Sequence, residues 1–539
     1  MFFSAQKRQI STIGVALIFS FYTASAGATP LAPTIRAPEN SPSVPRQTVQ
    51  APANTTGTTH SVPISGTPSP VQPAVQSGQT MRTEPAGTAQ SKREPVILNT
   101  SASTSPQPSQ TINTPVVPGH PFRIQNKVEN YNSLLSKTAT RKLDSALANM
   151  IGGYGEKVPG LGVIVFKNGK EVYRNMMGNR FLSPRNKNWN LPVTSESYFR
   201  VASISKIFTA AGYLHLAEQG KISLDEDVSR YLGFRLRNPH YPNSVITSRM
   251  LLSHTSSIRD YPTSYVPFKS NVGSFFTSED CWTRGRTPGT YFSYSNLNFV
   301  LLATIMEKVS GQRFDKYITR NVLKPLDIKG SFNLRDFSSS DLQKMGTLYR
   351  KTNGEAGRYY AQIDDRPIEL PDARRLANYR PGTNAGIFSP QGGLRISPEG
   401  LSHMLQMMMN RGKYQGKQVL QPETVQLMEK QVWKFNPARP NGDIDNDAIE
   451  SYGLALQYFS GTGSTRPVPG RPDFDLIGHL GEAYGFIGGL MWQPGTQNGF
   501  VFLQNGFATG YKLNKGRYSR NYRWEENFMR AIVENVFAK

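Results

Sequence analysis

Phe199-Arg200-Val201-Ala202-Ser203-Ile204-Ser205-Lys206 opens an amphipathic stretch that continues to Gln219 and stops before Gly220. This pattern predicts a helix over residues 203–219. In a helix that begins here, Ser203 and Lys206 lie three residues apart and share a face. A serine hydroxyl is a weak nucleophile, and a lysine amine one turn away can serve as its base. The same spacing also fits an ordinary helix start.

A second segment reads Pro288-Gly289-Thr290-Tyr291-Phe292-Ser293-Tyr294-Ser295-Asn296 and precedes a predicted helix over residues 296–309. The turn delivers Tyr294 just before that helix, so its phenol can point into a cleft. A tyrosine beside a lysine can transfer protons, because a nearby cation favours the phenolate. The Asn296 amide can bind a substrate amide and brace Lys206. The alternative is that Tyr294 is a core tyrosine with a satisfied hydroxyl.

A third segment, Ile477-Gly478-His479-Leu480-Gly481-Glu482, lies in a predicted strand. Residues 479 and 481 of a strand face the same side. His479 can then hydrogen-bond a substrate, and Gly481 lets the substrate approach the backbone closely. A single histidine on a strand is otherwise a structural residue.

Together the three segments resemble the motifs of the serine β-lactamase and penicillin-binding-protein superfamily, in particular its class C β-lactamase and D,D-peptidase/esterase branch. The neighbouring sequences Leu251–Ser256, Gly392–Leu394 and Tyr452–Leu454 are also similar to that branch. The resemblance implies catalytic roles for Ser203, Lys206 and Tyr294. It also implies an oxyanion hole formed by the backbone N–H groups of Ser203 and Glu482.

Two departures from the family pattern concern substrate recognition. His479-Leu480-Gly481 stands where the family has Lys-Thr-Gly, so a permanent cation and a hydroxyl are missing. Their loss weakens recognition of a substrate carboxylate. Glu482 occupies a position where a small residue is usual, and its carboxylate can repel anionic substrates.

Apolar runs cluster at both ends of the region from residue 123 to 539, with helical patterns between them. Strands are expected at 160–166, 170–175, 452–459, 476–480, 485–492 and 500–504, and further helices at 138–150, 397–411 and 525–537. Asn168-Gly169 predicts a hairpin turn between the first two strands. The expected fold is α+β, with one antiparallel sheet built from both ends, flanking helices and a mainly helical insert at roughly 205–385. This is the β-lactamase/transpeptidase-like arrangement that the resemblance implies.

The first 122 residues have a different character. Residues 1–28 combine a basic start, an apolar run and small residues suited to cleavage, which predicts an export signal. Residues 29–120 hold 16 of the 38 prolines and no aromatic residue, so residues 29–122 are expected to form a disordered linker. No later stretch is long and apolar enough to span a membrane. We therefore expect an exported protein, periplasmic or secreted.

Composition restricts the possible partners. The chain carries a formal charge of +23, but export makes a nucleic-acid partner improbable. One basic stretch contains Lys512, Lys515, Arg517, Arg520 and Arg523 among tyrosines. It is either a solvated face or a contact for an anionic cell-envelope polymer. With one cysteine and scattered histidines, no metal site and no cofactor are expected.

The sequence as a whole favours an exported serine hydrolase that forms an acyl-enzyme on ester or amide bonds. A D,D-peptidase-like or esterase activity on small-molecule or peptidoglycan-derived substrates fits best. A β-lactamase and a non-catalytic envelope-binding protein that keeps the fold remain as alternatives.

Overall fold

A computed structural model of the protein describes residues 133–153, 157–351, 358–444, 448–508 and 515–537. The predicted export signal and linker lie outside these ranges. Within them, no helix combines the length and the apolar character that crossing a bilayer requires.

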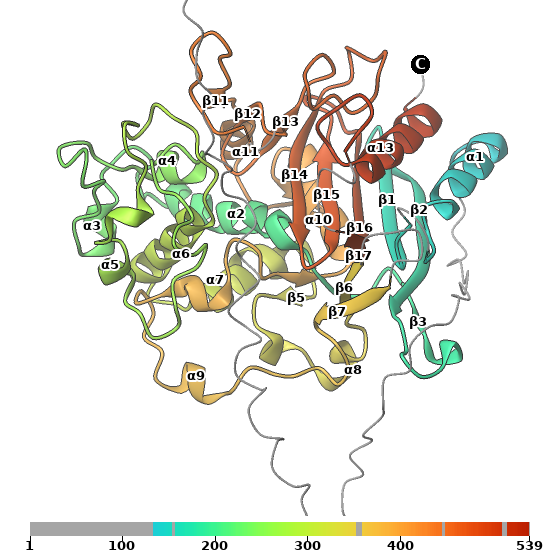
Figure 1. Ribbon diagram of the computed structural model, residues 1–539, viewed down its shortest axis with the longest axis horizontal. Coiled ribbons are helices and arrows are strands. Elements are labelled where there is room, and N and C mark those ends of the chain that lie inside the picture. Colours follow the sequence, from blue (N-terminus) through green and yellow to red (C-terminus); the bar gives the residue numbers. More distant parts are fainter. Residues whose placement is uncertain (1–132, 154–156, 352–357, 445–447, 509–514, 538–539) are drawn as a thin grey trace, which may run out of the picture. The chain divides into compact units, whose positions relative to one another are not determined.

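A nine-stranded antiparallel sheet forms the centre of the fold (Figure 1). Its strand order is β11-β12-β13-β14-β15-β16-β1-β2-β3, and every neighbouring pair is antiparallel. The strands are β1 (Gly160–Lys167), β2 (Lys170–Phe181), β3 (Leu191–Pro192), β11 (Trp433–Lys434), β12 (Ser451–Tyr452), β13 (Gln457–Phe459), β14 (Leu476–Ala483), β15 (Phe486–Trp492) and β16 (Gly499–Gln504).

The two ends of the folded region meet within this sheet. Strand β1 pairs with β2 on one side and with β16 on the other, with Val163 opposite Phe502. Asn168 and Gly169 both have positive φ, 52° and 76°, as a tight hairpin between β1 and β2 requires. The expected α+β fold, with an antiparallel sheet built from both ends, is confirmed.

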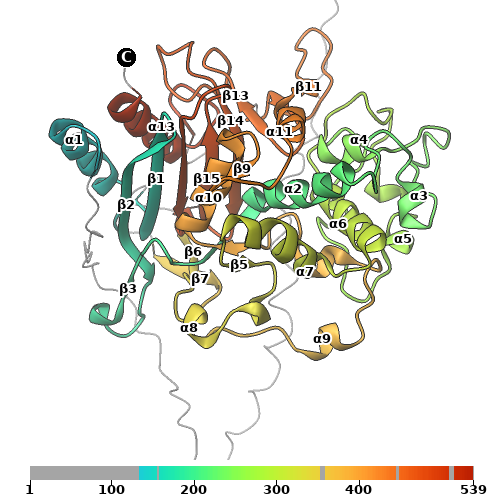
Figure 2. The same cartoon turned by 180° about the vertical axis from the view of Figure 1, so that it is seen from behind.

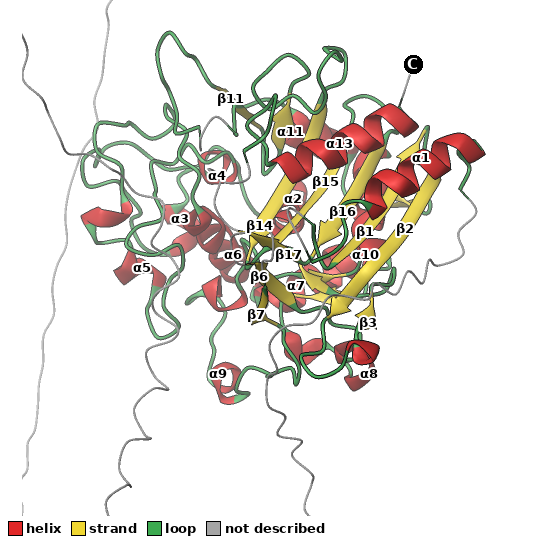
Figure 3. Cartoon of the chain, turned by 45° about the vertical axis from the view of Figure 1, so that its right-hand side comes forward, coloured by secondary structure: helices red, strands yellow, loops and turns green. Residues whose placement is uncertain are grey.

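Helices cover both faces of the sheet. Helices α1 (Lys137–Ala148) and α13 (Arg523–Val536) lie side by side on one face (Figure 3). Helix α10 (Pro398–Met409) packs on the other face against β1, β15 and β16, as Figure 2 shows from behind. Beneath α13, Phe528 is fully buried, and its ring centroid lies 4.3 Å from that of Phe502. Packed helices therefore bury both faces of the sheet.

The middle of the chain is mainly helical. Its two longest helices, α2 (Ser205–Glu218) and α6 (Asn296–Ser310), pack against each other and are buried along most of their length. The other helices of this part are α3 (Ser229–Leu232), α4 (Ser248–Leu252), α5 (Val272–Phe275), α7 (Phe314–Ile318), α8 (Ser339–Leu342) and α9 (Arg374–Ala377).

Short strands and one further helix complete the described structure. One small sheet joins β4 (Phe199–Arg200), β8 (Arg395–Ile396) and β5 (Gly330–Ser331), and another joins β17 (Gly506–Ala508), β6 (Leu348–Lys351) and β7 (Tyr359–Ile363). A hairpin pairs β9 (Lys413–Tyr414) with β10 (Lys417–Gln418), and helix α11 (Pro422–Glu429) follows it.

Strand β2 runs to Phe181, six residues past its predicted end, and β14 runs to Ala483, three residues past its predicted end. Two further differences concern backbone conformation. The predicted helix over 203–219 begins as a 3₁₀ turn, Ala202–Ile204, in which Ala202 has a left-handed φ of 46°, and α2 itself runs from Ser205 to Glu218. The predicted strand over 452–459 is divided into β12 and β13. Ala455 has a φ of 59°, and the chain reverses there with a Gly453 N–H to Leu456 carbonyl hydrogen bond of 2.8 Å.

The layer under α13 can be tested by mutation. Phe528→Ala should lower the free energy of unfolding by about 3–5 kcal/mol, because it leaves a cavity against Phe502 and the sheet. The measurement is urea-induced unfolding followed by circular dichroism. Glu534→Ala, at an exposed position of the same helix, should leave the stability nearly unchanged. Equal losses in the two variants would contradict this packing.

Candidate active site

Ser203 lies at the centre of the candidate site. It sits half-buried in the 3₁₀ turn that leads into α2. The residue before it, Ala202, adopts the sparsely populated left-handed region, a conformation that costs energy and often marks functional positions. The turn holds the Ser203 hydroxyl within hydrogen-bond reach of two side chains that sequence analysis places in the same site.

The first of these is Lys206, whose side chain is fully buried. Its Nζ lies 3.0 Å from Ser203 Oγ, 2.9 Å from Asn296 Oδ1 and 3.1 Å from the Gln391 carbonyl oxygen. A neutral amine has two N–H donors, which the two carbonyl-type oxygens can accept. Its lone pair then faces Ser203 Oγ, the geometry that a base requires.

Burial also prepares Lys206 to act as that base. Desolvation of the ammonium lowers the pKa of Lys206 to about 7, although the carboxylate of Asp260 opposes this shift. A substantial fraction of the amine is therefore neutral near pH 7. The site combines a nucleophile and a base of suitable pKa within contact distance.

Tyr294 is the second partner of Ser203. Its hydroxyl donates a hydrogen bond of 3.1 Å to Ser203 Oγ, and Lys206 Nζ lies 4.8 Å from the centre of its ring. The buried imidazole of His254 packs against the Tyr294 ring with centroids 4.3 Å apart. His254 Nδ1 also accepts the Ser295 N–H at 3.1 Å, so this histidine supports the turn that presents Tyr294.

Asp260, which no sequence motif indicated, holds the beginning of α6. Its half-buried carboxylate accepts hydrogen bonds from Asn296 Nδ2 at 2.7 Å, the Asn296 N–H at 3.0 Å, the Leu297 N–H at 3.1 Å and Ser295 Oγ at 2.8 Å. Because Asn296 Nδ2 donates to Asp260, its Oδ1 is turned toward Lys206. Capping residues usually stand next to their helix in sequence. Asp260 lies 36 positions before Asn296, so no local pattern indicated it.

The backbone around Gln391 was also missed. Its carbonyl oxygen accepts from Lys206, while the adjoining loop is fixed to α2 by two further bonds: Thr209 Oγ1 donates to the Pro390 carbonyl at 2.7 Å, and Ser205 Oγ accepts the Leu394 N–H at 3.1 Å. A carbonyl oxygen carries no side-chain signature, so only the folded structure reveals this acceptor.

The structure places His479 near the site but engages both of its ring nitrogens within the protein. Nδ1 faces the Leu480 carbonyl, which can only accept, so Nδ1 carries the proton and Nε2 accepts from the Tyr452 hydroxyl at 3.0 Å. Burial and the nearby Lys206 lower the pKa of His479 to about 3. His479, whose ring centroid lies 6.2 Å from that of Tyr294, is therefore neutral at ordinary pH.

Strand β14 passes directly beside the Ser203 turn. A Cβ at Gly481 would lie only 2.6 Å from the Val201 carbonyl oxygen, so glycine allows this close approach. Leu480 donates its N–H to Gln457 Oε1 at 2.9 Å on the β13 side. Because N–H groups alternate between the two edges of a strand, the N–H of Glu482, two residues after Leu480, also points toward the β13 side. Glu482 lies beyond Gly478, the last residue of β14 that pairs with β13. The oxyanion-hole role of this N–H and that of Ser203 stays a prediction.

The side chain of Glu482 is exposed and is separate from the role predicted for its backbone N–H. Its Oε2 accepts a hydrogen bond of 3.0 Å from the Tyr522 hydroxyl. Among the residues that the structure describes, no group of three or more His, Cys, Asp or Glu side chains is placed to hold a metal ion.

Comparison with known proteins now identifies the family. The family model described as "Beta-lactamase" matches residues 147–521, which is most of the chain. The chain belongs to the β-lactamase family. This assignment confirms the superfamily indicated by the three sequence segments, and the segments around Ser203, Tyr294 and His479 all fall within the matched region.

Curated relatives match a shorter stretch. Protein flp of Staphylococcus aureus (strain N315) is 33% identical over 172 residues, covering 31% of this chain and 34% of that protein. Penicillin-binding protein 4* of Bacillus subtilis (strain 168) is 29% identical over 189 residues, covering 32% of this chain and 37% of that protein. The match thus spans about a third of the length of these relatives.

A solved structure supports the fold over a longer range. The structure titled "EstCE1, a hydrolase with promiscuous acyltransferase activity" has a TM-score of 0.53 and 18% sequence identity. It covers 74% of this chain and 98% of that chain. At this identity the similarity concerns the architecture alone.

The lowered pKa of Lys206 leads to a prediction about pH. If the neutral amine is the base, the acidic limb of the kcat/KM profile for an ester substrate should rise through about pH 7. Lys206→Ala should lower kcat/KM by about 10²–10⁴-fold. Lys351→Met removes a second buried lysine, whose pKa is lowered to about 8, and should leave the acidic limb of the profile at the same pH. A profile that is flat from pH 5 to 9 in the parent would contradict the role of Lys206.

A second prediction concerns Asp260. Asp260→Asn places an amide where four donors converge, so the Asn296 amide should lose its orientation and kcat/KM should fall by about 10–100-fold. Loss of the carboxylate should also move the acidic limb to lower pH, because Asp260 raises the pKa of Lys206. Asp443→Asn serves as the control, since its amide oxygen can still accept from the Tyr291 hydroxyl. An unshifted limb in Asp260→Asn would count against this coupling.

Proposed function

We propose that this protein is an exported serine hydrolase that cleaves ester or amide bonds of cell-envelope substrates through an acyl-enzyme. The observation that carries the proposal is the convergence on Ser203 Oγ of Lys206 Nζ at 3.0 Å and the Tyr294 hydroxyl at 3.1 Å. A nucleophile within reach of a base and of a proton donor is the arrangement that acyl transfer needs.

The proposed reaction has two steps. Neutral Lys206 takes the Ser203 proton as Oγ bonds to the substrate carbonyl carbon, and the resulting oxyanion accepts from the N–H groups of Ser203 and Glu482. Collapse of this intermediate breaks the bond to the leaving group, which takes a proton from Tyr294. Lys206 returns a proton to Tyr294. Water then attacks the acyl-enzyme by the reverse sequence of proton transfers and releases the acid.

The electrostatics favour substrates that are uncharged where they meet β14. His479 is neutral and its nitrogens are engaged by Leu480 and Tyr452, so it offers no cation to a carboxylate. The exposed carboxylate of Glu482 adds negative charge near that strand. These features favour an esterase or amidase over an efficient β-lactamase. The partial match to penicillin-binding protein 4* supports a D,D-peptidase-like activity as the second candidate.

Export and an envelope substrate are proposed from the sequence. The signal at residues 1–28 and the linker at 29–122 would hold the catalytic domain beyond the membrane. Within the basic stretch, Lys515 and Arg517 are exposed and Arg520 and Arg523 half-buried, while Lys512 lies outside the described residues. The exposed members support contact with an anionic envelope polymer.

The proposal is tested first by labelling. A fluorescent fluorophosphonate should modify the parent protein and leave Ser203→Ala unlabelled, because the acyl-enzyme analogue forms on Ser203 Oγ. Ser274→Ala, at an exposed serine of α5 outside the site, is the control and should still be labelled. The measurement is in-gel fluorescence, with circular dichroism to verify folding. Equal labelling of Ser203→Ala and the parent would overturn the nucleophile assignment.

The substrate class is measured in the same preparation. A panel of p-nitrophenyl esters, D-amino-acid amides, D-alanyl-D-alanine peptides and nitrocefin should give the highest kcat/KM for the substrates without a carboxylate, which are the p-nitrophenyl esters and the D-amino-acid amides. Preferred hydrolysis of nitrocefin would instead indicate a β-lactamase. A correctly folded protein that is neither labelled nor active on any member would support the non-catalytic alternative.

A further inference from the structure

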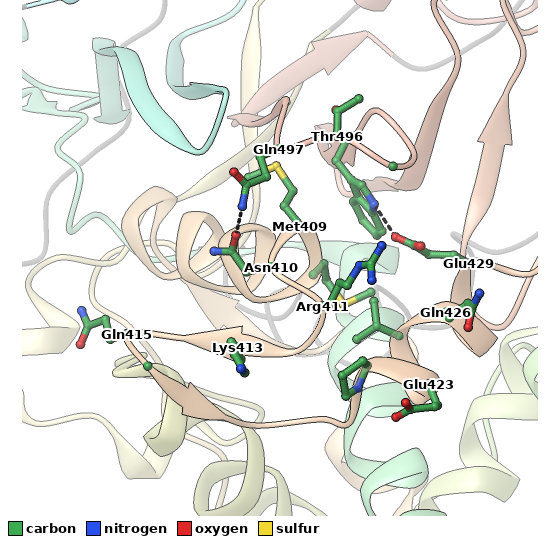
Figure 4. Close-up of a pocket in the computed structure, with 16 residues that line it drawn as sticks. Met409, Asn410, Arg411, Lys413, Gln415, Glu423, Gln426, Glu429, Thr496 and Gln497 are labelled. Carbon is green, nitrogen blue, oxygen red and sulfur yellow. Dashed lines mark hydrogen bonds between the residues drawn. The ribbon is translucent and has the colours of Figure 1, made fainter.

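A cavity of about 730 Å³ lies apart from Ser203, between α10, the β9–β10 hairpin, α11 and the end of β15 (Figure 4). This volume falls within the range typical of small-molecule sites. Its lining includes Met408 and Val425, whose side chains are almost fully buried. The cavity is thus bounded by residues of packed helices and strands.

The cavity lies at the opposite end of β14 and β15 from the Ser203 turn. Trp492, which lines it, pairs with Ile477 at the start of β14, whereas Gly481 beside the Ser203 turn pairs with Gly488. Four residues separate Gly488 from Trp492 along β15, about 13 Å at the rise of a strand. A ligand in this cavity would therefore occupy a site of its own.

Opposite charges meet inside the cavity without forming an ion pair. The carboxylate of Glu429 accepts a hydrogen bond of 2.8 Å at Oε1 from the Trp492 indole N–H. The Arg411 guanidinium extends into the same part of the cavity (Figure 4), and within the described residues it makes no salt bridge. Burial raises the pKa of Glu429, and Arg411 offsets part of that shift. A donor and an acceptor of opposite charge remain available to a ligand.

The lining as a whole is balanced in charge. Arg411 and Lys413 supply two positive groups, and Glu423 and Glu429 supply two negative ones. This balance suits a zwitterion better than a phosphate or a polyamine. The indole ring of Trp492 is 1% exposed, so it offers no face on which a sugar or a nucleobase could stack.

We infer that this cavity binds a zwitterionic amino acid or short peptide with free termini. The ligand ammonium donates to Glu429, and its carboxylate accepts from the Arg411 fork. The inference does not rest on the reaction proposed for Ser203.

Isothermal titration calorimetry with the full chain tests the inference, using Ser203→Ala to prevent turnover. The probes are L-alanine, L-alanyl-L-alanine, and the dipeptide with either its N-terminus acetylated or its C-terminus amidated. The free dipeptide should bind at least tenfold more tightly than either blocked form. Binding of L-alanine with equal affinity would assign the site to single amino acids, and weaker binding would assign it to peptides.

Two substitutions separate the charged contacts. Glu429→Gln keeps an acceptor for the Trp492 N–H. It should lower the affinity for the free dipeptide at least tenfold and abolish the effect of N-acetylation. Arg411→Asn suits the left-handed φ of 51° at that position, and it should abolish the effect of C-amidation. Glu369→Gln, an exposed carboxylate outside the cavity, is the control and should bind as the parent does.

Any of three results would overturn the inference: none of the probes binds, the free and blocked dipeptides bind equally, or dipeptide binding is unchanged in both Glu429→Gln and Arg411→Asn. Near-ultraviolet circular dichroism of each variant verifies that a lost signal does not come from misfolding. Fluorophosphonate labelling of each substitution in a background that retains Ser203 reports on the catalytic site separately, so failure here leaves the proposed hydrolase untouched.

Discussion

The burial of one amine constrains the rest of the structure. Lys206 is withdrawn from water, and a buried amine is costly unless its hydrogen-bonding groups are satisfied. Its partners come from three separate parts of the chain: the turn before α2, the start of α6 and the loop at Gln391. All three parts must come within hydrogen-bond distance of Nζ to offset the cost of burying the amine. The contacts that accommodate the amine therefore also bring the nucleophile and its base together.

The sheet and its covering helices were largely predictable because local patterns carry them. Alternating and continuous apolar runs located the long strands, and the Asn168-Gly169 dipeptide alone indicated the first hairpin. Failures occurred where backbone conformation overrides side-chain pattern. The first residues of the predicted helix form a 3₁₀ turn that starts at a left-handed Ala202, and a left-handed Ala455 divides the strand predicted over 452–459. Alanine gives no signal for such conformations, which tertiary packing imposes.

The site was predictable in part for a similar reason. Motif order placed Ser203, Lys206 and Tyr294 together, and the structure joins these side chains by hydrogen bonds. Asp260 and the Gln391 carbonyl escaped notice because their effects act across the fold, through an orientated amide and a backbone oxygen. The environment of His479 was equally hidden, since its Tyr452 partner lies on another strand. Sequence motifs indicate which groups participate, whereas folding determines which of their atoms stay available.

The pairing of β1 with β16 affects how the chain acquires its structure. Leu161 and Gln504 become neighbours although more than 300 residues separate them. During synthesis the amino-terminal hairpin emerges long before the strand that completes its pairing. Until then the chain exposes an apolar edge open to incorrect association. Contacts this distant in sequence also slow folding, since a large loop must close before they can form. Productive folding of this domain therefore depends on keeping the outer edge of β1 unpaired, or transiently shielded, until nearly the whole polypeptide is present.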